Sequence, residues 1–151
     1  MLAQYYLMLS IWTCAAYSAE ITPVHARCVN SIFSVYGSFT FAGVGSLSYY
    51  EAVCQNPLEV VSIYAASKVY CQSSDIQPGI NYLSSLCEQN GGFKLLPWSN
   101  FSENLTQSSI DHMRVVDYGQ VSPNEILNTS VLISKSFFDI GYETEVGPTT
   151  V

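Results

Sequence analysis

Apolar side chains recur at helical spacing in four segments between residues 28 and 92. Apolar residues at i, i+3, i+4 and i+7 share one face of an α-helix, so each segment predicts an amphipathic helix. The faces are formed by Cys28, Ile32 and Val35; by Leu47, Tyr50 and Cys54; by Val60, Tyr64, Ser67 and Cys71; and by Ile80, Leu83 and Cys87. The pattern predicts a mainly α, small helical domain in which each helix carries one inward-facing cysteine.

Proline and glycine indicate where these helices begin and end. Pro57 follows Asn56 and is expected in the first turn of the third helix, where a proline removes no helical hydrogen bond. The fourth helix is expected to begin near Pro78. Asn90-Gly91-Gly92 supplies its stop, because glycine readily adopts the left-handed conformation that ends many helices.

The periodicity weakens after Phe93. The stretch that begins at Leu95-Leu96-Pro97-Trp98 predicts an irregular, solvated region, and residues 122–134 could form a last helix or a strand. Residues 141–151 are polar and contain glycine and proline, so we expect a flexible tail. The predicted folded domain is therefore residues 19–140, with an irregular C-terminal third.

The N-terminus carries the localisation prediction. Tyr5 to Ala16 is an uncharged, mostly apolar run, and small residues follow it up to Ala19. Such a run is typical of a signal peptide, so we expect residues 1–18 to be removed by cleavage after Ser18, or after Ala19. The run is shorter than the ~20 residues that span a bilayer, and a buried N-terminal helix is the alternative. No later stretch resembles a transmembrane segment, which predicts a released protein, extracellular or at the cell surface.

Four cysteines remain once Cys14 leaves with the signal peptide. In the oxidising secretory route an even number of cysteines predicts disulfides, here two, with three pairings open. A four-thiolate zinc site is the alternative, but such sites usually contain closely spaced cysteine pairs. The gaps here are 25, 16 and 15 residues.

Three N-glycosylation sequons lie in the last third of the chain. They begin at Asn100, Asn104 and Asn128, and none has proline at its second position. Together with a signal peptide they predict a glycoprotein, although any single sequon can remain unmodified.

Composition and charge exclude several classes of partner. The chain has 12 Asp and Glu against 5 Lys and Arg, for a net charge of −7. An acidic chain without basic clusters is not expected to bind nucleic acid or an anionic membrane surface. With the signal peptide removed, its length is enough for one domain but not for two.

No catalytic or metal centre is predicted. His25 lies near the expected new N-terminus and His112 lies in a polar run, so neither indicates the base of a hydrolase. Gly43-Val44-Gly45 is only part of a nucleotide-binding glycine motif. Asp139, with the glutamates of the tail, could bind a cation but is better explained as a solvated acidic segment.

Several segments carry a family resemblance. They are Cys28, Phe39-Thr40-Phe41-Ala42-Gly43, Tyr49-Tyr50, Cys54-Gln55-Asn56-Pro57, Ser62 to Cys71, and Leu86-Cys87. In cysteine spacing and aromatic context the chain resembles the extracellular N-terminal region of fungal ferric-chelate reductase transmembrane components, over residues 28–139. Members often have a second cysteine near the first, and residues 31–33 contain none, so the resemblance implies no pairing for these four cysteines.

The resemblance implies a link to iron uptake. Those reductases act on extracellular ferric or cupric chelates, with electrons that pass from NADPH through FAD to two haems held by transmembrane histidine pairs. No motif for these cofactors occurs in this chain. We therefore expect an isolated ectodomain without electron-transfer activity, with ferric or cupric chelates or a membrane reductase as partners. The alternative is a secreted or cell-wall binding protein with no metal role.

Overall fold

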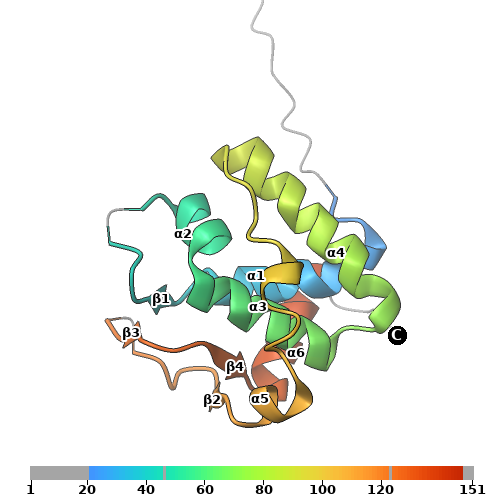
Figure 1. Ribbon diagram of the computed structural model, residues 1–151. Helices are drawn as coiled ribbons and strands as arrows, with labels where there is room; N and C mark the ends of the chain where they lie inside the picture. Colours follow the sequence, from blue (N-terminus) through green and yellow to red (C-terminus); the bar gives the residue numbers. More distant parts are fainter. Residues whose placement is uncertain (1–20, 46, 123, 148–151) are drawn as a thin grey trace, which may run out of the picture.

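The computed structural model describes residues 21–45, 47–122 and 124–147. The fold is mainly helical, as predicted, with α1 and α3 at its centre (Figure 1). The helices are α1 (Arg27–Tyr36), α2 (Tyr49–Gln55), α3 (Pro57–Tyr70), α4 (Ser73–Leu86), α5 (Gln107–Asp111) and α6 (Lys135–Val146). The predicted signal peptide, residues 1–18, lies outside the described residues.

Helix α3 is central because its sequence is apolar on nearly every side. A helix of this kind is stable only where other elements cover it. The residues with no exposed surface include Val60, Ile63, Tyr64, Ala65 and Ala66. Pro57 occupies the first turn, as predicted. The side-chain oxygen of Asn56 caps the helix by accepting from the backbone N–H groups of Leu58 and Glu59.

Two disulfides join the helices in pairs. Cys28 in α1 is bonded to Cys71 at the end of α3, with a Cα–Cα distance of 5.7 Å. Cys54 in α2 is bonded to Cys87 after α4, at 6.1 Å. The prediction of a disulfide-stapled helical domain is confirmed, and the structure selects one of the three open pairings. Because all four sulfur atoms are in disulfides, the alternative thiolate zinc site does not form.

Helix α4 begins earlier than predicted. It starts at Ser73 and includes Pro78, whose missing N–H removes only one hydrogen bond of the first turns. Gly79 then packs against α1 so closely that a Cβ atom there would lie 2.4 Å from Val29 Cγ2. Packing on α1 therefore outweighs the local preference that placed the start at the proline. A π-helical turn, Cys87–Gly91, continues α4, and Gly92 ends it with a φ of 73°, so the predicted stop is confirmed.

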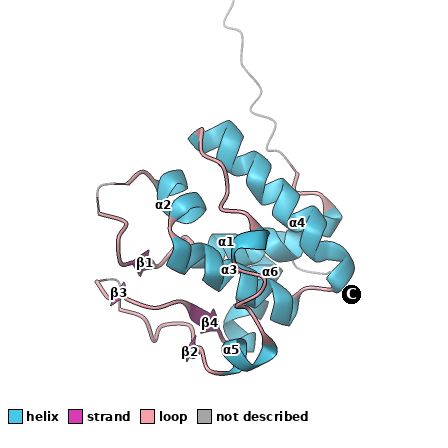
Figure 2. Ribbon diagram, viewed as in Figure 1, coloured by secondary structure: helices cyan, strands magenta, loops and turns pink. Residues whose placement is uncertain are grey.

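Four short strands form two parallel pairs, and all but β1 belong to the less regular last third. They lie on the side of the molecule opposite α4 (Figure 2). β1 (Thr40–Phe41) pairs with β3 (Ile126–Leu127), and β2 (Arg114–Val116) pairs with β4 (Val131–Ile133). Residues 122–134, left open as helix or strand by the sequence, thus contain strands.

Side-chain hydroxyls from the helices bond to the buried strand β4. The Tyr36 hydroxyl donates to the carbonyl of Val131 (2.8 Å) and accepts from the N–H of Ile133 (3.1 Å). The Tyr70 hydroxyl donates to the carbonyl of Ile133 (2.6 Å). Because buried backbone polar groups need partners, these tyrosines take the place of a third strand.

The stretch around Leu95 is packed rather than solvated, which corrects the prediction. Leu95 is 8% exposed, and the ring of Trp98 packs edge-on against Tyr64 at 5.1 Å. The contacts come from residues distant in sequence, so local composition did not reveal them.

Residues 141–146 belong to α6 and are not part of a flexible tail. Gly141 lies so near α1 that a Cβ atom would be 2.5 Å from Val35 Cγ2. The amide of Asn30 donates to the Glu145 carboxylate at 3.0 Å. The helix continues past the predicted boundary because α1 supplies a packing surface for it, and residues 148–151 lie outside the description.

Candidate functional site

A cleft opens between the loop after α1, the turn after β2 and the first turn of α6. Its volume is about 320 Å³, which is in the range of small-ligand pockets. The lining residues are Ser38, Phe39, Thr40, Asp117, Tyr118, Gly119, Val121, Ser122 and Phe137. The lining combines aromatic rings, hydroxyls and one carboxylate, so it can contact both the apolar and the polar parts of a ligand.

Asp117 is the charged group of this cleft. One of its oxygens, Oδ1, accepts hydrogen bonds from the hydroxyls of Ser134 (2.5 Å) and Ser136 (2.9 Å) and from the N–H of Tyr118 (2.8 Å). These donors, the Ser134 hydroxyl first, lower the pKa of Asp117 below its usual value because they stabilise the ionised form. The carboxylate is therefore negative and fixed in place.

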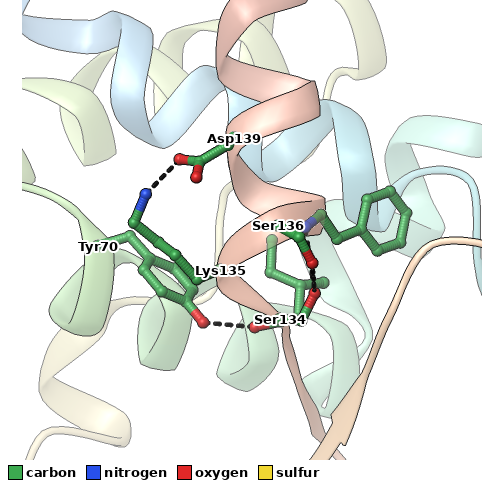
Figure 3. A network of polar contacts seen from close by, with 7 residues as sticks. Tyr70, Ser134, Lys135, Ser136 and Asp139 are labelled. Carbon is green, nitrogen blue, oxygen red and sulfur yellow. Dashed lines mark hydrogen bonds and ion pairs between the residues drawn. The ribbon is translucent and has the colours of Figure 1, made fainter.

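The start of α6 is fixed from both sides (Figure 3). Ser134 caps the helix by accepting from the N–H of Phe137 at 3.1 Å. The Tyr70 hydroxyl holds the carbonyl just before it, and Lys135 pairs with Asp139 on the outer face. The serines that bind Asp117 thus belong to a rigid segment.

Aromatic rings form the apolar walls. The ring of Phe137 packs edge-to-face against two other rings. Its centroid lies 5.8 Å from that of Phe39 and 5.5 Å from that of Tyr118. Tyr118 is 69% exposed, so most of its side chain is open to solvent. An exposed tyrosine beside a fixed carboxylate is typical of a binding surface, because the ring offers a flat contact and the carboxylate accepts N–H or O–H donors.

No protein family, curated protein or solved structure matches this chain. The interpretation of the cleft therefore depends on its own geometry. Neither Ser134 nor Ser136 has a histidine or lysine among its hydrogen-bond partners in the described residues, so a base-activated serine does not form there.

The histidines considered in the sequence lie away from the cleft residues. His25 Nδ1 bonds to Asp75 at 2.8 Å and joins the N-terminal turn to α4, so this part is less loose than expected. His112 Nδ1 bonds to the carbonyl of Ser108 at 2.6 Å within the α5 region. Within the described ranges, no three His, Cys, Asp or Glu side chains are grouped as a metal site, and no helix is long and apolar enough to cross a membrane.

Sequence reasoning missed the cleft because its residues come from three distant parts of the chain. The only local signal is Asp117-Tyr118-Gly119-Gln120, whose composition is typical of a turn and which places a large ring at its tip. The three sequon asparagines, Asn100, Asn104 and Asn128, are all exposed, and none lines this cleft.

One buried acid lies elsewhere in the fold. Glu59, in the first turn of α3, is 2% exposed, and its Oε1 has no hydrogen-bond partner among the residues that the structure describes. Burial raises the pKa of this carboxyl to about 8, so it is largely protonated at neutral pH. Tyr49 of α2 is near enough for the Glu59 charge to contribute to the raised pKa of the tyrosine, after burial, which is the larger cause.

Proposed function

We propose that this chain is an extracellular binding domain of the kind that precedes the membrane part of ferric-chelate reductases, without electron-transfer activity of its own. The observation that carries the binding role is the cleft in which ionised Asp117 lies beside the exposed ring of Tyr118. Two disulfides fit an oxidising compartment and thus an extracellular location.

The segments that carry the ferric-reductase resemblance support this proposal because several of them meet in the fold. The side-chain amide of Asn56 donates to the carbonyl of Ala42 at 2.8 Å while its oxygen caps α3. The neighbouring Cys54 is bonded to Cys87. These residues support the loop that carries Phe39 and Thr40 into the cleft. If ferric-reductase ectodomains have the same supporting residues, we expect them to have the same cleft.

The charge of the cleft narrows the class of chelate. Asp117 is ionised and the whole chain has a net charge of −7, so an anionic ferric chelate is repelled. A neutral ferric hydroxamate can donate N–H groups to the Asp117 carboxylate. Its C–H groups can pack on the aromatic rings of the cleft. We therefore propose neutral hydroxamate chelates of iron as the ligand class.

Calorimetric titration of the secreted chain tests this function. We expect binding of a neutral ferric trihydroxamate, no detectable binding of ferric citrate, and a loss of at least tenfold in affinity for Tyr118→Ala and for Asp117→Asn. Tyr142→Ala, which truncates another exposed tyrosine outside the cleft, is the matched control and should bind normally. Equal binding of both chelates, or none, would contradict the proposal.

A second candidate is a cell-wall binding protein. The observation that favours it is the exposed Tyr118 ring next to hydroxyls and a carboxylate, because sugars stack on aromatic rings and donate O–H groups to carboxylates. Retention on a wall polysaccharide that is lost in Tyr118→Ala, with no binding of ferric hydroxamate, would select this function.

A further inference from the structure

A second, mostly apolar cavity of about 160 Å³ lies between α3, α5 and the turn at residues 101–105 that leads into α5. Its walls include Val61, Phe101, Leu105 and Met113, and Asn104 also lines it. Asn104 is exposed and is the acceptor asparagine of the sequon Asn104-Leu105-Thr106. An N-glycan on this residue would begin at the cavity itself.

The backbone turn holds Phe101 and Asn104 together. The carbonyl of Phe101 accepts hydrogen bonds from the N–H groups of Asn104 (3.0 Å) and Leu105 (2.9 Å). Two residues joined in this way, three positions apart, have neighbouring side chains. The Phe101 ring also packs on Tyr64 of α3 at 6.1 Å, so it is supported from behind.

Two side chains hold the C-terminal end of this turn, at Asn104 and Leu105. Lys68 of α3 donates to the carbonyl of Leu105 at 2.7 Å. The hydroxyl of Ser109 in α5 donates to the carbonyl of Asn104 at 2.6 Å. The backbone of Asn104 is therefore held beside the cavity, so a glycan on this residue would start there.

We propose that the first N-acetylglucosamine of a glycan on Asn104 packs into this cavity and covers Phe101 and Met113. This inference rests on the extracellular location in the proposed function. The ring of this sugar has a face of C–H groups and an acetamido methyl, and burying them against Phe101 and Met113 removes apolar surface from water. Asn100 and Asn128 do not line the cavity, so a glycan on either one starts outside it.

Thermal unfolding of the full chain, secreted from a eukaryotic host, tests the proposal. An endoglycosidase trims every N-glycan to its first sugar, and intact mass reports the occupied sites. We expect the trimmed protein to melt about 4 °C or more above Asn104→Gln, on the order of the shift that one well-packed contact gives in a domain of this size. Asn128→Gln, trimmed in the same way, is the control and should melt within about 1 °C of the trimmed parent.

A double-mutant cycle shows whether Phe101 is the contact. In Phe101→Leu, which keeps an apolar side chain in the turn, the Asn104→Gln substitution should lower Tm by less than half as much as in the parent. Ring-current shifts of the sugar protons in NMR spectra, absent in Phe101→Leu, provide a direct second readout. An unmodified Asn104 in the secreted protein, equal Tm values for trimmed parent and Asn104→Gln, or no coupling with Phe101 would each overturn the proposal. Chelate or polysaccharide binding is measured separately, so failure of this proposal is distinct from failure of the proposed function.

Discussion

The helical half of the molecule and the part after Phe93 are stabilised in different ways. In the helical half, amphipathic helices pack together and disulfides join α1 to α3 and α2 to the end of α4. In the second part, the short strands make few strand-to-strand hydrogen bonds, and β3 pairs with β1 of the helical half. Serine, tyrosine and lysine side chains of the helices provide further partners for its backbone.

The difference shows which half depends on the other. Ser62 of α3 accepts from the N–H of Val131 (3.0 Å), and Tyr64 donates to the carbonyl of Leu96 (2.6 Å). These partners are positioned only after α3 has formed and been covered. The helical half therefore supplies many of the partners that order the last third with its Asp117 cleft, and it contains both disulfides, while the two parts share one hydrophobic core.

Removal of a disulfide should have the largest effect, because it acts on the half that organises the other. The two disulfides connect residues 43 and 33 positions apart, so chain entropy predicts a loss of about 4 kcal/mol for either one. Cys54→Ala/Cys87→Ala and Cys28→Ala/Cys71→Ala should both show this loss in urea unfolding monitored by circular dichroism. A loss below about 1 kcal/mol in either variant would mean that packing alone holds the helices in register.

Tyr36→Phe removes the hydroxyl through which α1 bonds to β4 of the second part. It removes one hydroxyl and leaves two buried backbone groups of β4, at Val131 and Ile133, without a partner. Each such group costs about 1–3 kcal/mol, so we expect a loss of about 2–4 kcal/mol. Tyr142→Phe, on an exposed side chain, should change the free energy of unfolding by less than about 0.5 kcal/mol. Equal effects of the two substitutions would show that the hydroxyl does not bridge the halves.

Glu59 makes the stability of the helical half depend on pH. Its pKa is about 8 in the folded protein and 4.5 ordinarily, so between these values the unfolded chain binds fewer protons than the folded one. The free energy of unfolding should therefore fall as pH rises, by up to about 1.4 kcal/mol per unit, and level off above pH 8.

Glu59→Gln should remove this dependence. The difference in free energy of unfolding between parent and Glu59→Gln, measured in denaturant at pH 5, 6, 7 and 8, isolates the effect of this one carboxyl. A difference that stays constant with pH would show that Glu59 is already ionised in the folded protein.

Ser134→Ala tests the second part alone and should have the smallest effect. Loss of the N-cap of α6 costs about 1 kcal/mol. The same change removes the first hydrogen-bond donor to Asp117, so the pKa of that carboxyl should rise toward its ordinary value. Carboxyl-carbon NMR titration measures this rise. An unchanged pKa with a lowered stability would show that Ser136 and Tyr118 suffice to hold the carboxylate.

The same contrast explains what the sequence predicted. Inward faces such as that of Cys28, Ile32 and Val35 follow from local spacing, and the starts and stops at Pro57 and Gly92 follow from backbone preferences of single residues. The start of α4 was misplaced because its packing on Val29 involves a residue far from Pro78 in sequence.

The cleft could not be predicted for a related reason. Asp117 becomes a fixed anion only when the N-cap Ser134 and Ser136 of α6 lie against it, and Phe39, from the first third of the chain, lines the same cleft. Local sequence contains the turn but not its partners. The ferric-reductase resemblance, the glycosylation of the three sequons and the signal peptide stay predictions.

The tyrosine hydroxyls on β4 also bear on self-association. A strand with free N–H and C=O groups along one side is a template on which another chain can add, and proteins avoid aggregation by blocking such sides. On one side of β4, the Tyr36 and Ser62 hydroxyls bond to the backbone C=O and N–H of Val131. The Tyr36 and Tyr70 hydroxyls bond to the N–H and C=O of Ile133, and β2 pairs with the opposite side of the strand. This most apolar strand of the second part is therefore closed to intermolecular strand addition, which protects the folded chain from aggregation through β4.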